Sequence, residues 1–399
     1  MIILFLIVFI GLVGFGIILP LFPFYAERFG ASPEVITWTM SAYTLSQALA
    51  TPVWGRLSDA YGRRLVLILT MLGSVISYLL LAYADELWLV LFSRVLGGLM
   101  AGNIATAFAY VTDITTEDDR SASLGKIGAA MGLGFIFGPA IGGLLAGAEV
   151  ETANYVLPAL AAAALSLVAA VGAIIFLPES LARADRKPFS WSRKTTAPGQ
   201  PDISLATVNR QGLLKLFIAA LIFYTAMSQM ESIFPLWAND LYGLGPRYIG
   251  SIFFYLGVIT VAMQAGMVGP LTRRFGDRPV AVASGVFFAI GLTGLAVLTA
   301  SWQVWIALLP FGIGVGLFNP TVSSIVSKSC SANERGAVMG KYQAASAWGR
   351  FFGPLWSGLM YSKISMVAPF ASAAVLMLPA VLLVFLFRLS PTEQEADAI

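Results

Sequence analysis

Histidine is absent from the 399-residue sequence, and cysteine occurs only once, at Cys330. A single cysteine excludes a disulfide within the chain and a thiolate-clustered metal site. Without histidine, zinc and iron have almost no ligands, and proton handling near neutral pH must fall to carboxylates. No nucleotide-binding motif is present, which excludes ATP as the energy source. We therefore expect no metal, no cofactor and no dependence on ATP.

Charged residues are also scarce, at 11% of the chain, whereas 58% of the residues are apolar. A soluble domain has about 25% charged residues, so this chain has too little polar surface to fold in water alone. Its apolar runs reach about 20 residues, the length that a helix needs to cross a bilayer. We expect an all-α integral membrane protein, and we interpret the run that begins at Met1 as the first helix and not as a removable signal.

Hydropathy predicts twelve transmembrane helices. Their approximate ranges are 2–24, 36–56, 64–84, 88–112, 123–147, 155–177, 213–238, 247–271, 279–300, 303–327, 337–361 and 366–388. The longest polar interval follows the sixth span. We therefore predict a first six-helix bundle over 1–180, a cytoplasmic linker over 181–212 and a second six-helix bundle over 213–399.

The positions of lysine and arginine predict the orientation, because these residues stay on the cytoplasmic side. With both termini inside, only Arg28, Arg247 and Lys363 of the 24 basic residues fall on outer loops, and only Arg94 and Arg350 lie away from the ends of the spans. The net charge of +3 therefore reflects topology and gives no evidence of nucleic-acid binding. We expect a multi-pass protein of the cell inner membrane, and a monomer.

The two halves repeat in sequence. Residues 119–143 align without a gap on 334–358, which matches Arg120 to Arg335 and Gly138-Pro139 to Gly353-Pro354. "GRLSDAYGRR" (55–64) likewise aligns on "GPLTRRFGDR" (269–278). A parallel repeat of six helices predicts two pseudo-symmetric bundles with a substrate site between them near the middle of the membrane, as in secondary transporters.

The loop motif "GRLSDAYGRR" resembles the signature between helices 2 and 3 of the major facilitator superfamily. Its matching residues are Gly55, Asp59, Gly62, Arg63 and Arg64. The resemblance implies a gate on the cytoplasmic face, in which charges and a helix end hold the bundles closed. Asp113 resembles the family acid that pairs with these arginines. Alternatively, the loop arginines are ordinary basic residues of the cytoplasmic side, and Asp113 is an acid at a solvated helix end.

Two further motifs carry the same resemblance. "GLGFIFGPAIGG" in the fifth span places Gly134, Gly138, Pro139, Gly142 and Gly143 in a pattern similar to the signature of the family's drug:proton antiporters. "GFGIILPLFP" in the first span is similar to tetracycline-type efflux pumps. Those pumps carry an aspartate near the position of Gly11, so the usual proton site of helix 1 is missing here. Glycines spaced by four can also serve helix packing alone.

Buried polar residues supply the candidate transport site. Glu231 is the one acid placed well inside a span, and with Tyr224 and Ser228 it shares one face of the seventh. Arg94 lies four residues before Gly98, a spacing similar to the family's arginine motif in helix 4, although its side chain could also extend to the membrane–water interface. Further candidates for substrate binding are Tyr43, Gln47, Asn103, Phe311, Asn319 and Gln343. Some of these side chains would instead join helices to one another.

We therefore predict a secondary transporter that resembles drug:proton antiporters, with Glu231, Arg350 and Arg94 as the proton-coupling residues. A carboxyl group in a low-dielectric cavity is more easily protonated than one in water, so Glu231 could carry the proton and also receive a cationic drug. Alternatively, Arg350 neutralises Glu231 permanently. An exporter of organic anions or amphipathic lipids, a membrane sensor without transport and an enzyme are the competing functions. No cluster of nucleophile, base and orienting residue supports the enzyme.

Overall fold

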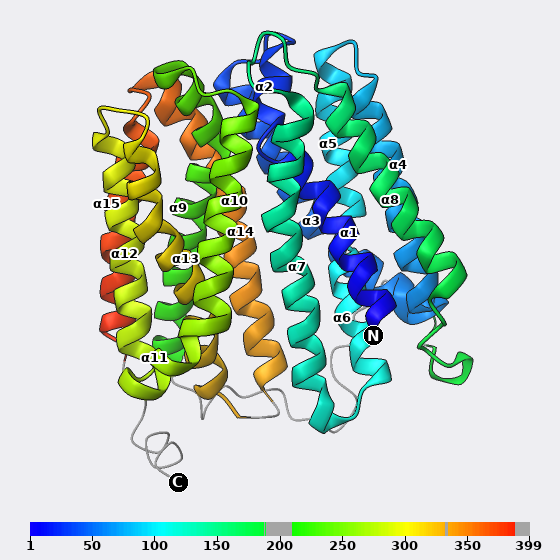
Figure 1. Ribbon diagram of the computed structural model, residues 1–399. Coiled ribbons are helices and arrows are strands. Elements are labelled where there is room, and N and C mark those ends of the chain that lie inside the picture. Colours follow the sequence, from blue (N-terminus) through cyan, green and yellow to red (C-terminus); the bar gives the residue numbers. More distant parts are fainter. Residues whose placement is uncertain (187, 189–209, 332–333, 388–399) are drawn as a thin grey trace. The chain divides into compact units, whose positions relative to one another are not determined.

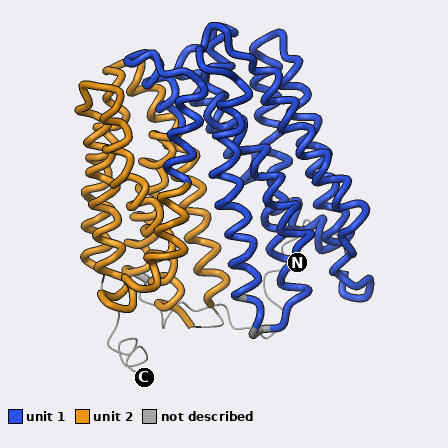
Figure 2. The backbone as a smooth tube through the Cα atoms, viewed as in Figure 1, with its two compact units in different colours: residues 1–191, 232–257 blue, residues 192–231, 258–399 orange. Residues whose placement is uncertain are grey.

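A computed structural model describes residues 1–186, 188, 210–331 and 334–387 of the chain (Figure 1). These residues form helices and connecting turns, with no strand among them. Most of the predicted linker 181–212 lies outside the described residues. The chain divides into two compact units: unit 1 contains 1–191 and 232–257, and unit 2 contains 192–231 and 258–399 (Figure 2).

Each predicted span corresponds to one helix or to two or three consecutive helical segments. In the first half these are α1 (Ile2–Ile18), α2 (Phe22–Glu27), α3 (Pro33–Tyr61), α4 (Arg63–Ala82), α5 (Leu87–Met100), α6 (Asn103–Ile114), α7 (Glu117–Ala146) and α8 (Val156–Phe176), followed by the short 3-10 helix η1 (Arg183–Asp185). In the second half they are α9 (Arg210–Tyr242), α10 (Pro246–Ala262), the π-helix η2 (Met263–Met267), α11 (Val268–Phe275), α12 (Asp277–Val297), α13 (Gln303–Lys328), α14 (Arg335–Lys363) and α15 (Ala368–Phe385).

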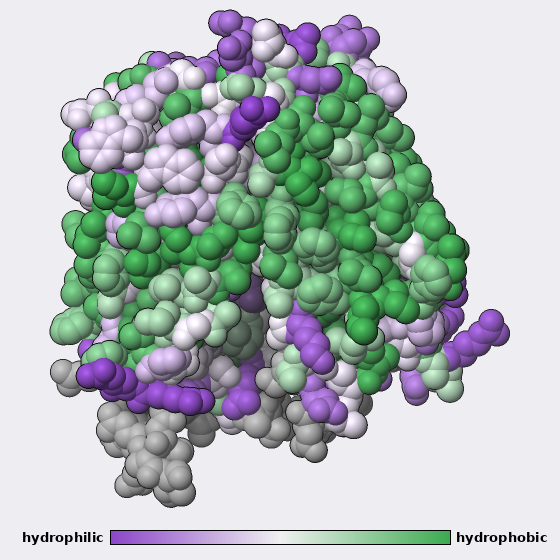
Figure 3. All heavy atoms as spheres, in the orientation of Figure 1, coloured by the Kyte–Doolittle hydropathy of each residue, from purple (hydrophilic) through white to green (hydrophobic). Residues whose placement is uncertain are grey.

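Nine helices or pairs of helices within the described residues are long and apolar enough to cross a membrane, and α1 is a shorter apolar helix. The helices α3 and α14 have 29 residues each, enough for a span of roughly 40 Å at 1.5 Å per residue. On the face shown in Figure 3, apolar side chains cover the middle of the helices and hydrophilic ones gather near their ends. This distribution fits helices whose middle portions face lipid.

Local signals explain where the helices start and stop. The Ser32 hydroxyl accepts a hydrogen bond from the Val35 N–H, and Pro33 opens α3 at the position where a missing N–H costs nothing. The helix ends at Gly62, whose φ of 107° is open only to glycine at little cost, and α4 starts at the next residue. Gly276, at the aligned position of the second half, has φ of 83° between α11 and α12. The repeat therefore extends to backbone conformation.

Each unit has its own packed interior. In unit 1, α1 packs against α7 and α8, and Leu4, Val8 and Met71 belong to a buried cluster that α4, α6, α7 and α8 complete. In unit 2, α12 packs between α13 and α15. The rings of Phe223 and Phe318 stack there with centroids 3.9 Å apart and planes 6° apart, which joins α9 to α13. These interiors hold the polar side chains described next in fixed positions.

Candidate functional site

Arg63 is the centre of a polar cluster at the predicted inner end of unit 1. Its Nη1 donates to Ser58 Oγ at 2.8 Å and to Asp59 Oδ1 at 2.5 Å, and its Nε donates to Asp113 Oδ2 at 3.0 Å. The side chain is only 11% exposed, so the two carboxylates offset the cost of burying its charge. Arg63 therefore ties the end of α3 to the end of α6.

Glu179 completes this cluster from the segment that follows α8. Its Oε1 accepts hydrogen bonds from the backbone N–H groups of Arg63, Ser180 and Leu181, at 2.8, 3.1 and 3.2 Å. A carboxylate at the first N–H of α4 complements the positive end of the helix dipole. Ser180 Oγ also donates to Asp113. We call Ser58, Asp59, Arg63, Asp113, Glu179 and Ser180 the Arg63 cluster.

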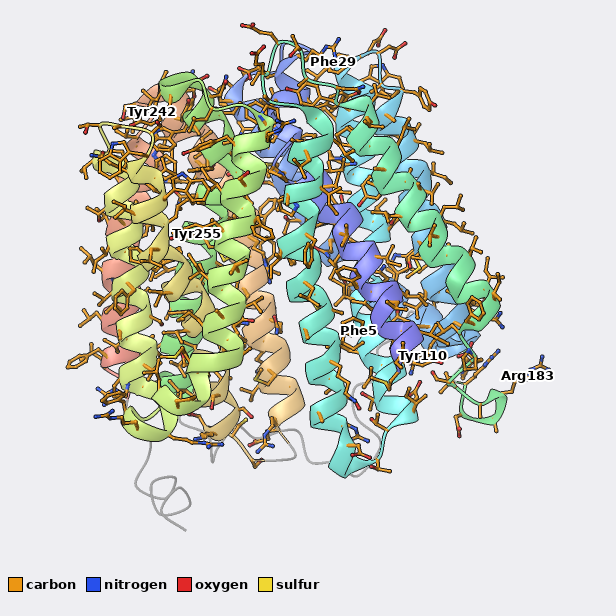
Figure 4. All side chains as sticks on the ribbon, viewed as in Figure 1. Phe5, Phe29, Tyr110, Arg183, Tyr242 and Tyr255 are labelled. Atoms are coloured by element: carbon orange, nitrogen blue, oxygen red, sulfur yellow. The ribbon has the colours of Figure 1, made fainter. Side chains whose placement is uncertain are left out.

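Arg64 has a different role from Arg63. Its Nη2 donates to the backbone carbonyl of Ile174, in the last turn of α8, and no ion pair joins it to Asp113 among the described residues. Tyr110, labelled in Figure 4, donates its hydroxyl hydrogen to the Pro178 carbonyl just beyond the same helix. Thus Arg63 binds the carboxylates of Asp59 and Asp113, while Arg64 binds a backbone carbonyl at the end of α8.

Unit 2 carries a charge-reversed counterpart of the Arg63–Asp113 pair. The repeat alignment places Asp277 opposite Arg63 and, extended back by six residues, Lys328 opposite Asp113. Asp277 Oδ2 lies 3.2 Å from Lys328 Nζ and accepts a hydrogen bond from Ser324 Oγ. Arg278, opposite Arg64, donates to the carbonyl of Phe385 in the last turn of α15. Both units therefore have an ion pair at the aligned positions, with the acidic and basic residues exchanged.

The glycines of the fifth-span motif bring α7 against α1. A Cβ added at Gly138 would lie 2.6 Å from Gly16 Cα, and one at Gly142 would lie 2.4 Å from the Ile17 carbonyl oxygen. Gly134 faces Leu12 in the same way. Such distances are too short for any side chain, so the two helices touch through their backbones.

The same motif also faces α10, within unit 1. A Cβ at Gly143 would lie 2.7 Å from the Pro246 carbonyl oxygen, and one at Gly250 would lie 2.4 Å from the Pro139 carbonyl oxygen. Pro139 leaves a carbonyl in α7 without its usual helical donor. The motif therefore gives α7 two faces without bulky side chains, one in contact with α1 and one in contact with α10.

The fourth predicted span is interrupted at Ala101–Gly102, between α5 and α6. The carbonyls freed near this break receive donors from α3: Gln47 Nε2 lies 3.2 Å from the Ala101 oxygen, and Trp54 Nε1 lies 2.6 Å from the Leu99 oxygen. Asn103 opens α6 directly after the break. Interrupted helices in transporters commonly lie beside the substrate path, where their free backbone groups are needed.

Arg94 is buried in α5, with 6% of its surface exposed. Its guanidinium carbon lies 5.9 Å from the ring centroid of Phe22 and 5.7 Å from that of Tyr78. Tyr43 is also within electrostatic range of Arg94, and its ring packs on Phe15 with centroids 5.4 Å apart. The guanidinium is therefore enclosed by aromatic side chains of unit 1.

In unit 2, Glu231 and Arg350 interact electrostatically, but no ion pair within 4 Å joins them in the described residues. Arg350 instead lies over the ring of Tyr224, with its Cζ 4.7 Å from the centroid. Glu231 is partly buried, whereas Arg350 is exposed within this structure. The arginine is therefore close enough to influence the carboxylate without neutralising it through direct contact.

The remaining candidate residues of unit 2 have diverse surroundings. Ser228 Oγ donates to the Tyr224 carbonyl at 2.7 Å and lies 3.3 Å from the Gly349 carbonyl oxygen, which holds α9 against α14. Phe311 is buried against Phe288, and Asn319 Oδ1 accepts a hydrogen bond from the Tyr342 hydroxyl. Gln343 is exposed. The structure thus brings Tyr224, Glu231 and Arg350 together and places Phe311 in the packed interior of unit 2.

Comparison with known proteins assigns the chain to a family. The family model for the Major Facilitator Superfamily matches residues 4–269 and 246–398. Multidrug resistance protein 2 of Bacillus subtilis is 28% identical over 93% of this chain and 90% of its own length, and tetracycline resistance protein class C of Escherichia coli is 28% identical over 88% and 86%.

Solved structures show the same fold. The human organic anion transporter MFSD10 superposes with a TM-score of 0.71 at 21% identity and covers 96% of this chain and 98% of its own. A nucleoside transporter superposes with a TM-score of 0.78 at 14% identity and covers 97% and 98%. The resemblance seen in the sequence motifs is confirmed, and the chain belongs to the Major Facilitator Superfamily as a multi-pass membrane transporter.

Proposed function

We propose that the protein is a proton-coupled exporter of hydrophobic small molecules, with Glu231 as the proton carrier. The observation that carries this proposal is the position of Glu231, the one acid set well inside a predicted span, near Arg350 but not in direct contact with it. A carboxylate locked in a tight ion pair would exchange its proton poorly. A nearby guanidinium instead favours the charged form whenever the substrate leaves.

The transport cycle follows from competition for this one charge. Protonation of Glu231 from the outer side removes the negative charge that holds a substrate, and the substrate leaves. Deprotonation toward the inner side restores the charge, and a new substrate binds. Proton and substrate then move in opposite directions, as an antiporter with alternating access requires. Arg94, Tyr43, Gln47, Asn103, Tyr224, Ser228, Phe311, Asn319 and Gln343 remain our candidates for contact with the substrate or for coupling.

The proposal also covers the oligomeric state, the location, the gate and the substrate class of the transporter. We propose a monomer in the cell inner membrane with both termini in the cytoplasm, and the Arg63 cluster as the inner gate. The names of the relatives, multidrug and tetracycline resistance proteins, favour drug-like substrates. We propose transport as the activity, with no catalysed reaction.

Transport in proteoliposomes tests this function directly. With the lumen acidified, we expect the protein to accumulate ethidium or tetracycline in the lumen, and a protonophore to abolish the accumulation. The Glu231→Gln variant should lose uphill transport, while Glu151→Gln, the same chemical change at an exposed loop position, should keep it. Equal uphill transport by Glu231→Gln and the parent protein would contradict the proposal.

A second candidate function is the export of organic anions or amphipathic lipids. The observation that favours it is Arg94, a buried cation for which no acidic partner lies among the described residues. This function would keep the proton cycle and change the class of substrate.

A further inference from the structure

Arg94 carries a positive charge that no carboxylate in the described part of the chain balances. Its Nη2 is buried and has no hydrogen-bond partner among the described residues, while its Nε lies 3.4 Å from Ser93 Oγ. A buried charge without a partner is strongly unfavourable inside a membrane protein, so intramembrane arginines normally meet an anion or a water-filled cavity. The missing partner therefore has to come from outside the described chain.

The described side chains around Arg94 supply no acceptor for its Nη2. Phe22 and Tyr78 contact the guanidinium through their rings, which attract its charge but cannot accept its in-plane N–H groups as carbonyl or carboxylate oxygens do. The hydroxyl groups of Tyr43 and Tyr78 make no hydrogen bond to the described residues, so both can donate to an added acceptor. The cluster thus offers donors in excess and lacks an acceptor.

A small pocket of unit 1 shares Phe22 with this cluster. Its lining includes Phe22, which also contacts Arg94, and Tyr25, which is within electrostatic range of Arg94. Leu21 and Leu81 add aliphatic surface, and the Tyr25 hydroxyl is already bonded to the Leu81 carbonyl. Most of this lining is apolar, so Phe22 and its neighbours place an apolar surface beside the guanidinium.

We propose that Arg94 and the hydroxyl groups of Tyr43 and Tyr78 bind the carboxylate of an amphipathic organic anion, whose apolar part contacts Phe22. A guanidinium is suited to this ligand because its planar N–H groups match the two oxygens of a carboxylate. The role of the bound anion as a transported substrate rests on the proposed transport function. The binding itself needs no proton gradient.

Equilibrium dialysis of the purified full chain in a neutral detergent tests the site. The probe is 1-naphthylacetate, and 1-naphthylacetamide has the same ring system without the charge. We expect the parent protein to bind the carboxylate at least about tenfold more tightly than the amide, the ratio expected for charge-assisted hydrogen bonds to a buried guanidinium. Arg94→Gln should remove this preference, and Arg247→Gln, at an exposed arginine, should keep it.

Two further variants keep the test decisive if Arg94→Gln fails to fold. Tyr78→Phe removes one hydroxyl and keeps the ring, and it should weaken carboxylate binding several-fold without affecting the amide. Arg94→Lys keeps the charge without the planar donor set, and it should fall between the parent and the Gln variant. Equal affinity of the parent protein for carboxylate and amide would overturn the proposal. So would unchanged carboxylate binding in the folded Arg94→Gln or Tyr78→Phe variant.

The phosphate of an anionic lipid shares the chemistry of the carboxylate, so its contribution is measured separately. Dialysis in nanodiscs of phosphatidylcholine, with and without phosphatidylglycerol, shows whether the lipid displaces the probe. Displacement supports the anion site and identifies the headgroup as its occupant, and retention of the probe supports the organic anion. Since the assay has no gradient, loss of proton-driven transport in Glu231→Gln with intact probe binding would leave this site standing.

Discussion

At the residue scale, Arg63 shows how one buried side chain organises the predicted inner end of unit 1. It contacts Ser58 and Asp59 in α3 and Asp113 in α6, while its backbone N–H donates to Glu179 beyond α8. The turn at Gly62 makes these contacts possible, because it delivers Arg63 directly after α3 ends. A change at the turn should therefore disturb the whole Arg63 cluster.

We predict that Gly62→Ala destabilises the protein by about 1–3 kcal/mol, the cost of forcing a side chain into a backbone region open only to glycine. The φ of Gly62 is 107°, and an added Cβ would lie 2.2 Å from the Glu179 carboxylate. Thermal unfolding in detergent, followed by intrinsic tryptophan fluorescence, should show a lower midpoint, and transport should fall with it.

Gly55→Ala is the matched control for this substitution. Gly55 belongs to the same motif but lies inside α3, and an added Cβ would meet nothing within 4 Å. Alanine there should be neutral or slightly stabilising. Equal midpoints for Gly62→Ala and Gly55→Ala would show that the turn is not a strained, glycine-dependent position.

The sequence predicted part of the Arg63 cluster. Asp59, Arg63 and Asp113 stood out because they match the family motif between helices 2 and 3 and the acid that pairs with it. Glu179 was missed, since it lies in a polar segment where carboxylates are common and its partner at the start of α4, the Arg63 N–H, is 116 residues away in sequence. The "PES" that follows α8 was the available signal, because a carboxylate just beyond a helix is well placed to cap the start of another.

At the element scale, hydropathy predicted which segments form helices but not how they are interrupted. The break at Ala101–Gly102 and the π-helix Met263–Met267 lie within single predicted spans. A hydropathy window averages over about 19 residues and cannot detect a local loss of helical hydrogen bonds. The donors that stabilise the first break, Gln47 and Trp54, come from another helix.

Helix packing through glycine gives a second prediction. Gly138→Ala should destabilise the contact between α1 and α7 by about 1–3 kcal/mol, the usual cost of overpacking, because its Cβ would meet backbone atoms of α1 that cannot move aside. Gly125→Ala is the control in the same helix, where an added Cβ has open space. The measurement is the unfolding midpoint together with transport. A Gly138→Ala protein as stable and active as Gly125→Ala would rule out the close backbone contact.

The inverted ion pair of unit 2 gives a third prediction, to be measured as a double-mutant cycle. Asp277→Lys places a second cation beside Lys328 and should lower the unfolding midpoint, and Lys328→Asp should do the same with two acids. The double exchange should recover much of the loss, by about 0.5–1 kcal/mol, because Lys328 is half exposed and the pair is screened by water. Additive losses in the double variant would show that the two charges do not interact.

At the scale of the whole molecule, the repeat was the most informative feature of the sequence. It predicted a parallel six-plus-six arrangement, and the structure shows matching turns at Gly62 and Gly276 and matching pairs at Arg63–Asp113 and Asp277–Lys328. That Glu231 and Arg350 interact without a direct ion pair among the described residues could not be predicted in the same way. Both residues lie in apolar helices, and the distance between their charged groups depends on side-chain conformation. Hydropathy carries no information about side-chain conformation.

The single cysteine allows the orientation to be measured without any mutation. Cys330 follows α13 and is partly exposed. If the termini are cytoplasmic, this position faces the cytoplasm, so a membrane-impermeant maleimide should leave it unlabelled in intact cells. The same reagent should label it in inverted vesicles. Strong labelling in intact cells would reverse the predicted topology.

The exchange of a proton for a substrate is the central claim, and proton release on substrate addition measures it most directly. Proteoliposomes without an imposed gradient and with a pH-sensitive dye in the lumen receive external ethidium or tetracycline. Antiport predicts that the lumen becomes alkaline as the substrate enters, that Glu151→Gln behaves like the parent, and that Glu231→Gln gives no change in luminal pH. Substrate entry through the parent protein without any movement of protons would contradict the account.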